Sequence, residues 1–236
     1  MSTPLSVPVS AIRALLLDWV SQQLTPAALD WVLQKEHLLN EGHSNLDFYL
    51  TLGTVPRHTG KGAVNLTSDQ IIQAQALIPG WQPQYDRVDQ LVRILFLLEL
   101  PTLHLDTYKQ IVQLLFTTAE TGELVAFCRA LPLLSYPKTV LLPLATEALR
   151  HNVLDVFKAV ACNNPFPYQY FDDAAFNQMV LKAAFNNIDL NSIYRLNHRS
   201  NEALQDMMTD FVAERRAAGR SVAPSWLELS TGCLAY

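Results

Sequence analysis

The sequence DRVDQLVRILFLL, residues 86–98, is the clearest indication of the fold class of this 236-residue chain. From Leu91 onward a single charged residue, Arg93, interrupts an otherwise apolar run. A helix that is apolar nearly all round is a buried helix, because a surface helix would show a polar face. We therefore predict a helix over residues 86–98 at the centre of a helical bundle.

On both sides of this stretch, apolar side chains recur with the 3.6-residue period of amphipathic helices. Ser10 and Ser68 are predicted to cap helix starts, and Pro26 suits a first helical position after Thr25. Asp172 and the pair Ser200-Asn201 are predicted caps farther along, and Gly219 is a predicted helix end. The predicted helices cover residues 10–20, 26–42, 46–52, 68–77, 86–98, 105–115, 121–131, 137–149, 153–161, 173–185 and 202–218.

No convincing strand appears, because alternation of apolar and polar residues never persists beyond a few positions. Helices joined by short turns pack antiparallel, as in helical hairpins. We predict an all-α fold built as an irregular stack of antiparallel hairpins, either a HEAT-like α-solenoid or an orthogonal bundle. No fixed-period repeat decides between them. One domain is expected over residues 1–236.

Residues 54–67 are rich in glycine and proline and are predicted to form a long loop. With Arg57 and Lys61, its backbone N–H groups could make an anion-binding cradle. It is not a P-loop, because Val55 stands at the first glycine position and Gly62 follows Lys61. The simpler interpretation is a solvated loop in which Arg57 forms a salt bridge with a neighbouring helix.

The segment NNPFPY, residues 163–168, is predicted to end a helix. Asn163 can take a left-handed conformation, and proline cannot continue a helical turn. In a functional interpretation, the two prolines hold Phe166 and Tyr168 rigidly at the mouth of a pocket.

Two further groups of polar residues are candidate ligand contacts. Asn177, Gln178 and Lys182 lie on the predicted helix 173–185, either bonding to a neighbouring helix end or forming a polar pocket wall. Arg199 precedes the last long predicted helix, and Arg215 lies near its C-terminal end, where the helix dipole favours cations. If these residues converge with Arg57 and Lys61, they form an anion pocket.

The composition excludes several classes of function. Half of the residues are apolar, only 17% are charged and the net charge is −5, so nucleic acid is not an expected partner. Cys128, Cys162 and Cys233 form no CxxC pair, which suits a reducing compartment. No signal peptide or span of ~20 apolar residues is apparent, and the predicted location is the cytoplasm.

Catalytic motifs are lacking as well. The six histidines are scattered without metal-ligand spacing, and no GxSxG sequence is present. We therefore assign no catalytic residue, no metal and no cofactor, and favour a binding protein over an enzyme.

Several stretches share a recognisable pattern: Pro56-Arg57, Thr59-Gly60-Lys61, Val88-Asp89-Gln90, Gly122-Glu123-Leu124, residues 149–152, 156–161, 163–172 and 175–183, and Arg199-Ser200-Asn201 with the tail to Arg220. Together they resemble the EboA family over roughly residues 45–222. The chain departs from the family pattern at Phe166, where tyrosine is expected, and at Phe176, where tryptophan is expected. Without the tyrosine hydroxyl, a role of Phe166 in hydrogen-bonding a ligand is less supported.

This resemblance implies a process rather than a mechanism. EboA proteins are encoded in the ebo gene cluster, common in cyanobacteria, and take part in moving secondary-metabolite precursors, such as those of scytonemin, towards the periplasm. The apolar-rich helices, the lack of catalytic spacing and the aromatic residues Phe166, Tyr168, Tyr170 and Phe171 lead us to expect a non-enzymatic carrier or adaptor within this process. Its expected partners are an aromatic metabolite or other ebo-cluster proteins, including membrane-associated ones. It would work in the cytoplasm or at the inner face of the cytoplasmic membrane. The alternative is an enzyme that modifies a precursor or lipid through a polar pocket.

Overall fold

The computed structural model describes residues 8–41, 44–100 and 104–232. The all-α prediction is confirmed: the regular elements in these ranges are helices, and an isolated bridge between Ala63 and Arg87 stands outside any named strand. The chain divides into two compact units, Met1–Val160 and Ala161–Tyr236. The single-domain organisation and the HEAT-like stacking stay predictions.

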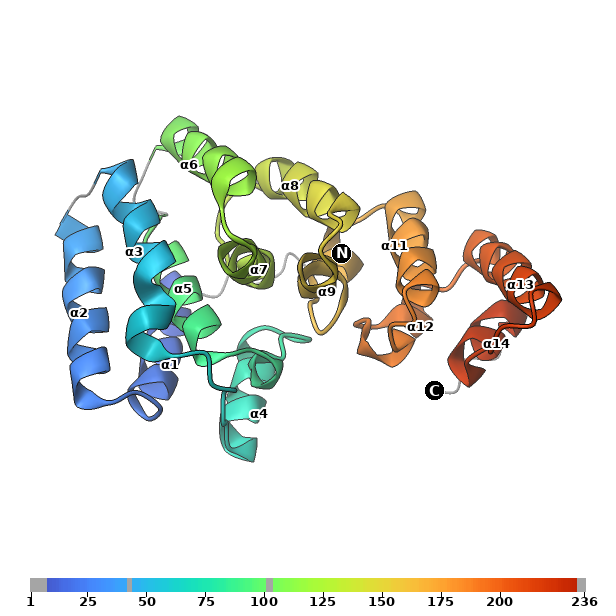
Figure 1. Cartoon of the computed structure of the whole chain (residues 1–236), viewed down its shortest axis with the longest axis horizontal. Helices are drawn as coiled ribbons and strands as arrows, with labels where there is room; N and C mark the ends of the chain where they lie inside the picture. Colours follow the sequence, from blue (N-terminus) through green and yellow to red (C-terminus); the bar gives the residue numbers. More distant parts are fainter. Residues whose placement is uncertain (1–7, 42–43, 101–103, 233–236) are drawn as a thin grey trace. The chain divides into compact units, whose positions relative to one another are not determined.

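The first unit holds α1 to α9 (Figure 1). Its elements are α1 (Val9–Ser21), α2 (Pro26–Glu41), α3 (Asn45–Thr59), α4 (Ser68–Leu77), the short 3₁₀ helix η1 (Pro83–Tyr85), α5 (Val88–Leu97), α6 (Leu105–Thr118), α7 (Thr121–Ala130), α8 (Lys138–Arg150) and α9 (Leu154–Ala161), whose last residue belongs to the second unit. The second unit continues with α10 (Phe166–Tyr170), α11 (Asp173–Phe185), η3 (Leu190–Ser192), α12 (Leu196–Arg199), α13 (Glu202–Ala217) and α14 (Pro224–Thr231).

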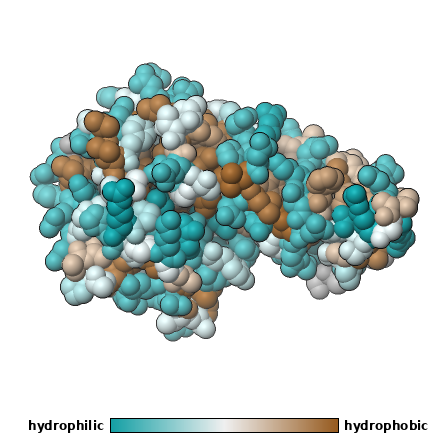
Figure 2. Space-filling view, in the orientation of Figure 1, coloured by the Kyte–Doolittle hydropathy of each residue, from teal (hydrophilic) through white to brown (hydrophobic). Residues whose placement is uncertain are grey.

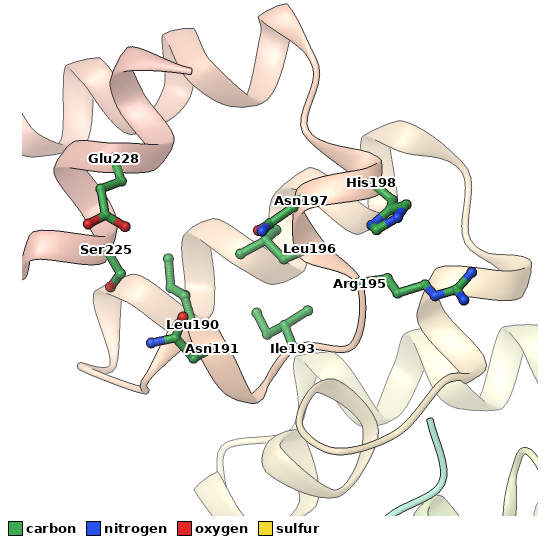
Figure 3. Close-up of a pocket in the computed structure, with 9 residues that line it drawn as sticks. All are labelled: Leu190, Asn191, Ile193, Arg195, Leu196, Asn197, His198, Ser225 and Glu228. Carbon is green, nitrogen blue, oxygen red and sulfur yellow. The ribbon is translucent and has the colours of Figure 1, made fainter. Parts of the chain in front are cut away.

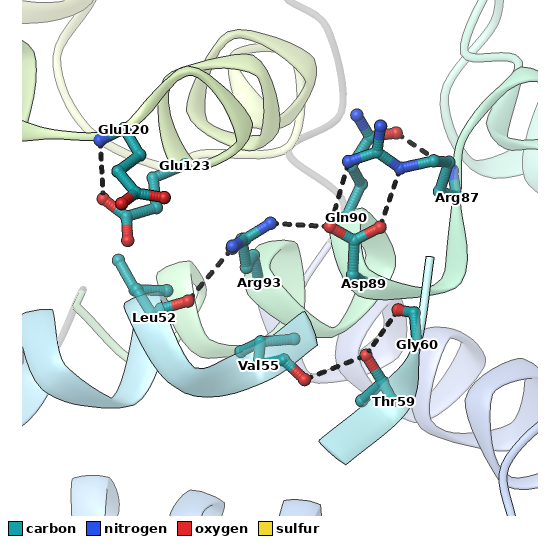
Figure 4. Close-up of polar contacts among 10 residues, drawn as sticks. All are labelled: Leu52, Val55, Thr59, Gly60, Arg87, Asp89, Gln90, Arg93, Glu120 and Glu123. Atoms are coloured by element: carbon teal, nitrogen blue, oxygen red, sulfur yellow. Dashed lines mark hydrogen bonds and ion pairs between the residues drawn. The ribbon is translucent and has the colours of Figure 1, made fainter. Parts of the chain in front are cut away.

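Helix α5 is the centre of the first unit, as its sequence predicts. All of its residues are buried, and it packs against α1, α2, α3 and α7. The polar residues of its first turns are buried too. Asp89 is 0% exposed and accepts hydrogen bonds from Arg87 Nε at 2.8 Å and Arg93 Nη1 at 2.7 Å (Figure 4). A buried carboxylate is tolerated because two guanidinium groups compensate its charge.

The prediction of a loop over residues 54–67 is wrong for residues 54–59, because α3 continues to Thr59 with Pro56 inside it. Proline has no N–H, so the carbonyl of Leu52, four residues earlier, loses its helical partner. Arg93 Nε, on the neighbouring α5, donates to this carbonyl at 3.0 Å (Figure 4). Arg93, which is distant in the sequence, thus supplies the hydrogen-bond donor that the Leu52 carbonyl lacks within its own helix.

Several helix ends follow the predicted caps. Thr25 Oγ1 accepts from Ala28 N at 3.3 Å, and Asp172 Oδ1 accepts from Ala175 N at 2.8 Å. Gly219 follows α13 with φ 66°. Two predicted caps are wrong. Pro8 rather than Ser10 precedes α1, without a side-chain bond, and Thr67 rather than Ser68 caps α4 in a reciprocal pair with Gln70.

The other predicted helices agree with the structure to within a few residues, and α11 matches its predicted range. The predicted end of α2 near Gly42 lies outside the described residues. The sequence interpretation missed α10, α12 and α14, which have five, four and eight residues. Helices α10 and α12 have too few turns for an apolar period to stand out, whereas α14 is as long as α9, which was predicted.

Candidate functional site

The nine predicted site residues fall into two groups by unit. Arg57 and Lys61 belong to the first unit and the other seven to the second. Arg57 is exposed in the last turn of α3, where the helix dipole favours a cation. The prediction of a salt bridge for Arg57 is wrong, because Arg57 forms no ion pair with any described residue. Convergence of the two groups in one anion pocket stays a prediction.

Arg199 joins three segments of the second unit. Its guanidinium donates to the carbonyl oxygens of Tyr168 at 2.9 Å and Phe171 at 3.0 Å. It also donates to Asp173 Oδ1 at 2.7 Å and lies 4.8 Å from the ring centroid of Phe176. The first two bonds satisfy carbonyls at the end of α10, so Arg199 fixes the passage from α10 to α11.

Asn177 and Asn201 form a reciprocal amide pair between α11 and the start of α13. Asn177 Nδ2 donates to Asn201 Oδ1 at 3.0 Å, and Asn201 Nδ2 donates to Asn177 Oδ1 at 3.1 Å. Asn201 Oδ1 also accepts from Leu204 N at 3.0 Å and so caps α13. The interpretation of Asn177 as a partner of a neighbouring helix end is therefore confirmed.

Arg215 and Asn163 also make local contacts. Arg215 Nε donates to the carbonyl of Ser221 at 2.9 Å, and its guanidinium lies 5.0 Å from the ring centroid of Trp226. Asn163 has the predicted left-handed backbone, φ 53°, and its N–H donates to the carbonyl of Ser192 at 2.7 Å.

Of the three remaining predicted residues, Lys61 is exposed just after the end of α3, and Gln178 and Lys182 lie on α11. Gln178 is exposed and Lys182 half-buried.

Two adjoining cavities in the second unit are the candidate site. One has a volume of about 240 Å³ and the other about 540 Å³, and Asn191, Ser225 and Glu228 line both. They lie between the segment that contains η3 and α12 and the start of α14 (Figure 3). Ligand pockets typically have volumes of about 300–1,000 Å³, so the pair is large enough for a small molecule.

The cavity wall combines apolar and polar groups. The smaller cavity is lined by the apolar side chains Leu190, Ile193 and Leu196. The larger one is lined in part by Trp226 and Asp189. Six of the nine residues that line the smaller cavity are polar, and its three apolar residues are almost fully buried, so its surface is mainly polar.

Strained backbone marks both cavities. Within the described ranges, the non-glycine residues with positive φ are Asn163, Asn187 at 55° and Arg195 at 51°. Asn187 lines the larger cavity and Arg195 the smaller one. A left-handed arginine costs on the order of 1–2 kcal/mol, and such strain concentrates at functional sites.

Arg195 is held outside the smaller cavity by two tyrosines. Its guanidinium lies 5.5 Å from the ring centroid of Tyr168 and 5.4 Å from that of Tyr194. A side-chain hydrogen bond with Tyr168 raises the pKa of Arg195. Figure 3 shows this guanidinium pointing away from the other labelled residues, so Arg195 contributes its stem and backbone to the wall.

Sequence reasoning identified none of the residues shared by the two cavities. The sequence Ala223-Pro224-Ser225-Trp226 indicates a helix start, because proline is favoured at the first helical position. It does not indicate that η3 lies across the cavities from this helix.

Among the residues that the structure describes, no group of three or more His, Cys, Asp or Glu side chains could hold a metal ion. No helix in the described ranges is long and apolar enough to cross a membrane. Cys128 and Cys162 are buried, burial raises the pKa of the Cys128 thiol to about 12, and Cys233 lies outside the described residues.

The comparisons with known proteins agree with the resemblance. The family model described as "Metabolite traffic protein EboA" matches residues 12–230. No curated protein and no solved structure matches the chain. Because the family model spans most of the sequence, this chain belongs to the EboA family of metabolite traffic proteins.

Proposed function

We propose that this chain is a non-enzymatic binding protein of metabolite traffic, and that it holds a small molecule in the paired cavities of its second unit. The observation that carries the proposal is the pair of cavities that share Asn191, Ser225 and Glu228. The apolar residues of the wall suit the body of an aromatic metabolite, and the shared polar residues suit its substituents.

The polar residues predicted from the sequence support binding in these cavities rather than at a separate polar pocket. The side chains of Arg199, Asn177 and Arg215 are occupied by helix ends and loop carbonyls. They hold the segments that surround the cavities in place. A site whose surrounding contacts are already made in the absence of a ligand is preorganised for binding.

In this proposal the cargo is a secondary-metabolite precursor, such as one of scytonemin, that is handed on towards the periplasm. The chain would work in the cytoplasm or at the inner face of the cytoplasmic membrane, with other ebo-cluster proteins as partners. The alternative of an enzyme that modifies a precursor or lipid stays a prediction.

Capture of a metabolite tests the proposal directly. Purified protein is incubated with a small-molecule extract of the native host, repurified and examined by native mass spectrometry. We expect a bound compound on the wild type and none on Ser225→Phe, because a phenyl ring at this position fills space shared by both cavities.

Ala203→Phe is the matched control, because Ala203 is exposed in the first turn of α13 and does not line either cavity. An equal amount of compound on both variants contradicts the proposed cavity. No compound on the wild type contradicts the carrier role.

A second candidate function, docking of a partner protein, is favoured by exposed leucines on α3. Leu46 is 64% exposed and Leu50, one turn later, is 57% exposed. Figure 2 shows apolar side chains at the surface in the region of α3. Between them, Tyr49 donates its hydroxyl to the carbonyl of Ile111 at 3.0 Å, which holds this face of α3 beside α6.

The double variant Leu46→Lys/Leu50→Lys tests docking. Because both side chains are already exposed, we expect stability to change by no more than about 0.5 kcal/mol. Capture of ebo-cluster proteins from a host lysate should fall at least tenfold if this face is the docking surface. Unchanged capture by the folded variant contradicts this candidate.

A further inference from the structure

We propose that the ligand of the paired cavities carries a protonated amine, and that Glu228 is the residue that recognises it. This inference rests on the proposed function and names the chemical class of its ligand.

Glu228 supplies an uncompensated negative charge to both cavities. Its side chain is exposed on α14 and lines both spaces. Within the described part of the chain, its carboxylate makes no ion pair and no hydrogen bond. Figure 3 shows it at the end of the smaller cavity opposite Arg195, next to Ser225.

The arginines close to the cavities are engaged elsewhere. Arg195 lies against the rings of Tyr168 and Tyr194, with its guanidinium directed away from the cavity. Arg215 donates to the carbonyl of Ser221 and to Asn187 Oδ1 at 3.4 Å. A ligand carboxylate therefore finds no uncommitted guanidinium, although His198 lines the smaller cavity, and at the Glu228 end it would meet a like charge.

The groups beside Glu228 accept hydrogen bonds as well. Asn191 can accept through its amide oxygen and Ser225 through its hydroxyl oxygen, and both line the same two cavities; because both also carry donors, the charge of Glu228 is what selects a cation. An ammonium group has three donors and no acceptor, which matches a carboxylate with two neutral oxygen acceptors. Charge-assisted bonds of this kind are stronger than neutral ones.

The apolar part of the wall accounts for the rest of the ligand. Leu190, Ile193 and Leu196 line the smaller cavity. A ligand with an amine at one end and a compact apolar or aromatic body at the other fits both parts of the wall. A plain amine of this type is phenethylamine, and its acidic and neutral counterparts are 3-phenylpropionate and 2-phenylethanol.

The test is a titration of the full-length protein with these three probes, followed by amide NMR shifts at pH 7. We expect phenethylamine to shift signals from residues 187–198 and 221–228 and to bind at least tenfold more tightly than the other two. Glu228→Gln should weaken phenethylamine binding at least tenfold. Glu214→Gln, which removes an exposed carboxylate on α13 that does not line the cavities, should leave it unchanged.

The outcomes separate this inference from the proposed function. If 3-phenylpropionate or 2-phenylethanol shifts the same signals with equal affinity, or Glu228→Gln binds phenethylamine as the wild type does, the amine assignment is overturned while the cavity stands. If no probe shifts these signals, the amine assignment is overturned as well. Capture of a metabolite from host extract, blocked by Ser225→Phe, then decides the proposed function independently.

Discussion

At the scale of single residues, Arg93 has two structural roles in the first unit. Its side chain is only 4% exposed. It compensates the buried carboxylate of Asp89 and supplies the donor that Pro56 denies to the carbonyl of Leu52. Gly122 makes room for it, because a Cβ at that position would lie 3.1 Å from Arg93 Nη1.

Replacing Arg93 with methionine should therefore be severely destabilising. Asp89 would keep only Arg87, whose side chain is 40% exposed, and the carbonyl of Leu52 would lose its donor. Breaking a buried ion pair by removing one partner costs about 3–5 kcal/mol. Urea denaturation followed by circular dichroism measures the loss, and a change below 1 kcal/mol contradicts this role.

A second substitution isolates the contribution of the Leu52 carbonyl. Pro56→Ala restores the helical N–H, so it should recover about 1 kcal/mol in the Arg93→Met background. In the wild type, where Arg93 already satisfies the carbonyl, the same change should gain less. Equal effects in the two backgrounds would show that the two residues are not coupled.

Asn163 gives a test of backbone strain at another single residue. With φ 53°, it occupies a region that alanine adopts only at a cost and glycine adopts freely. We expect Asn163→Ala to lower the free energy of unfolding by about 1 kcal/mol and Asn163→Gly to change it much less. Thermal unfolding of both variants checks this, and equal loss in both would point to the side chain instead.

At the scale of elements, α5 lies between two buried acids whose titration is linked to folding. Burial raises the pKa of Asp86, just before α5, to about 6, although Arg129 opposes the shift. Burial raises the pKa of Glu99, just after α5, to about 7, with Arg13 opposing the shift and Glu36 adding to it. Both values lie above those of an unfolded chain.

These shifts predict that stability falls with rising pH. The folded state holds the two protons more tightly than the unfolded chain, so their contribution is complete at about pH 4 and is lost as the pH rises through about 6 and 7. We expect the double variant Asp86→Asn/Glu99→Gln to lose this slope, as measured by urea denaturation between pH 5 and 8. A slope equal to that of the wild type contradicts the assignment.

The same elements show how far the sequence predicts this fold. Long helices such as α6 and α11 were predictable because their apolar stripes repeat over several turns, and Tyr108, Ile111, Val112 and Leu115 are indeed buried. Helix α3 was cut short in the prediction because Pro56 is a local helix breaker, and the donor that rescues it comes from α5. The residues around Pro56 do not indicate that Arg93, 41 residues from Leu52 in the sequence, supplies this donor.

At the scale of the whole molecule, the candidate site was less predictable than the fold. The predicted residues were polar, but Asn177 bonds to Asn201 and Arg199 to Asp173, across 24 and 26 residues of chain. The sequence offered bonding to a neighbouring helix end as one interpretation of Asn177, but only the folded chain identifies the partner as Asn201. Conversely, Asn191 and Ser225 are ordinary turn and helix-start residues in the sequence, and it is packing that brings them to shared cavities.

Binding of a small molecule between α14 and the segment that contains η3 and α12 can be measured by hydrogen–deuterium exchange. The full-length protein is compared with and without the metabolite fraction captured from host extract. We expect slower exchange at residues 187–198 and 221–228, with exchange elsewhere little changed. Slower exchange confined to another segment, such as α3, or no change in exchange at any segment, would contradict it.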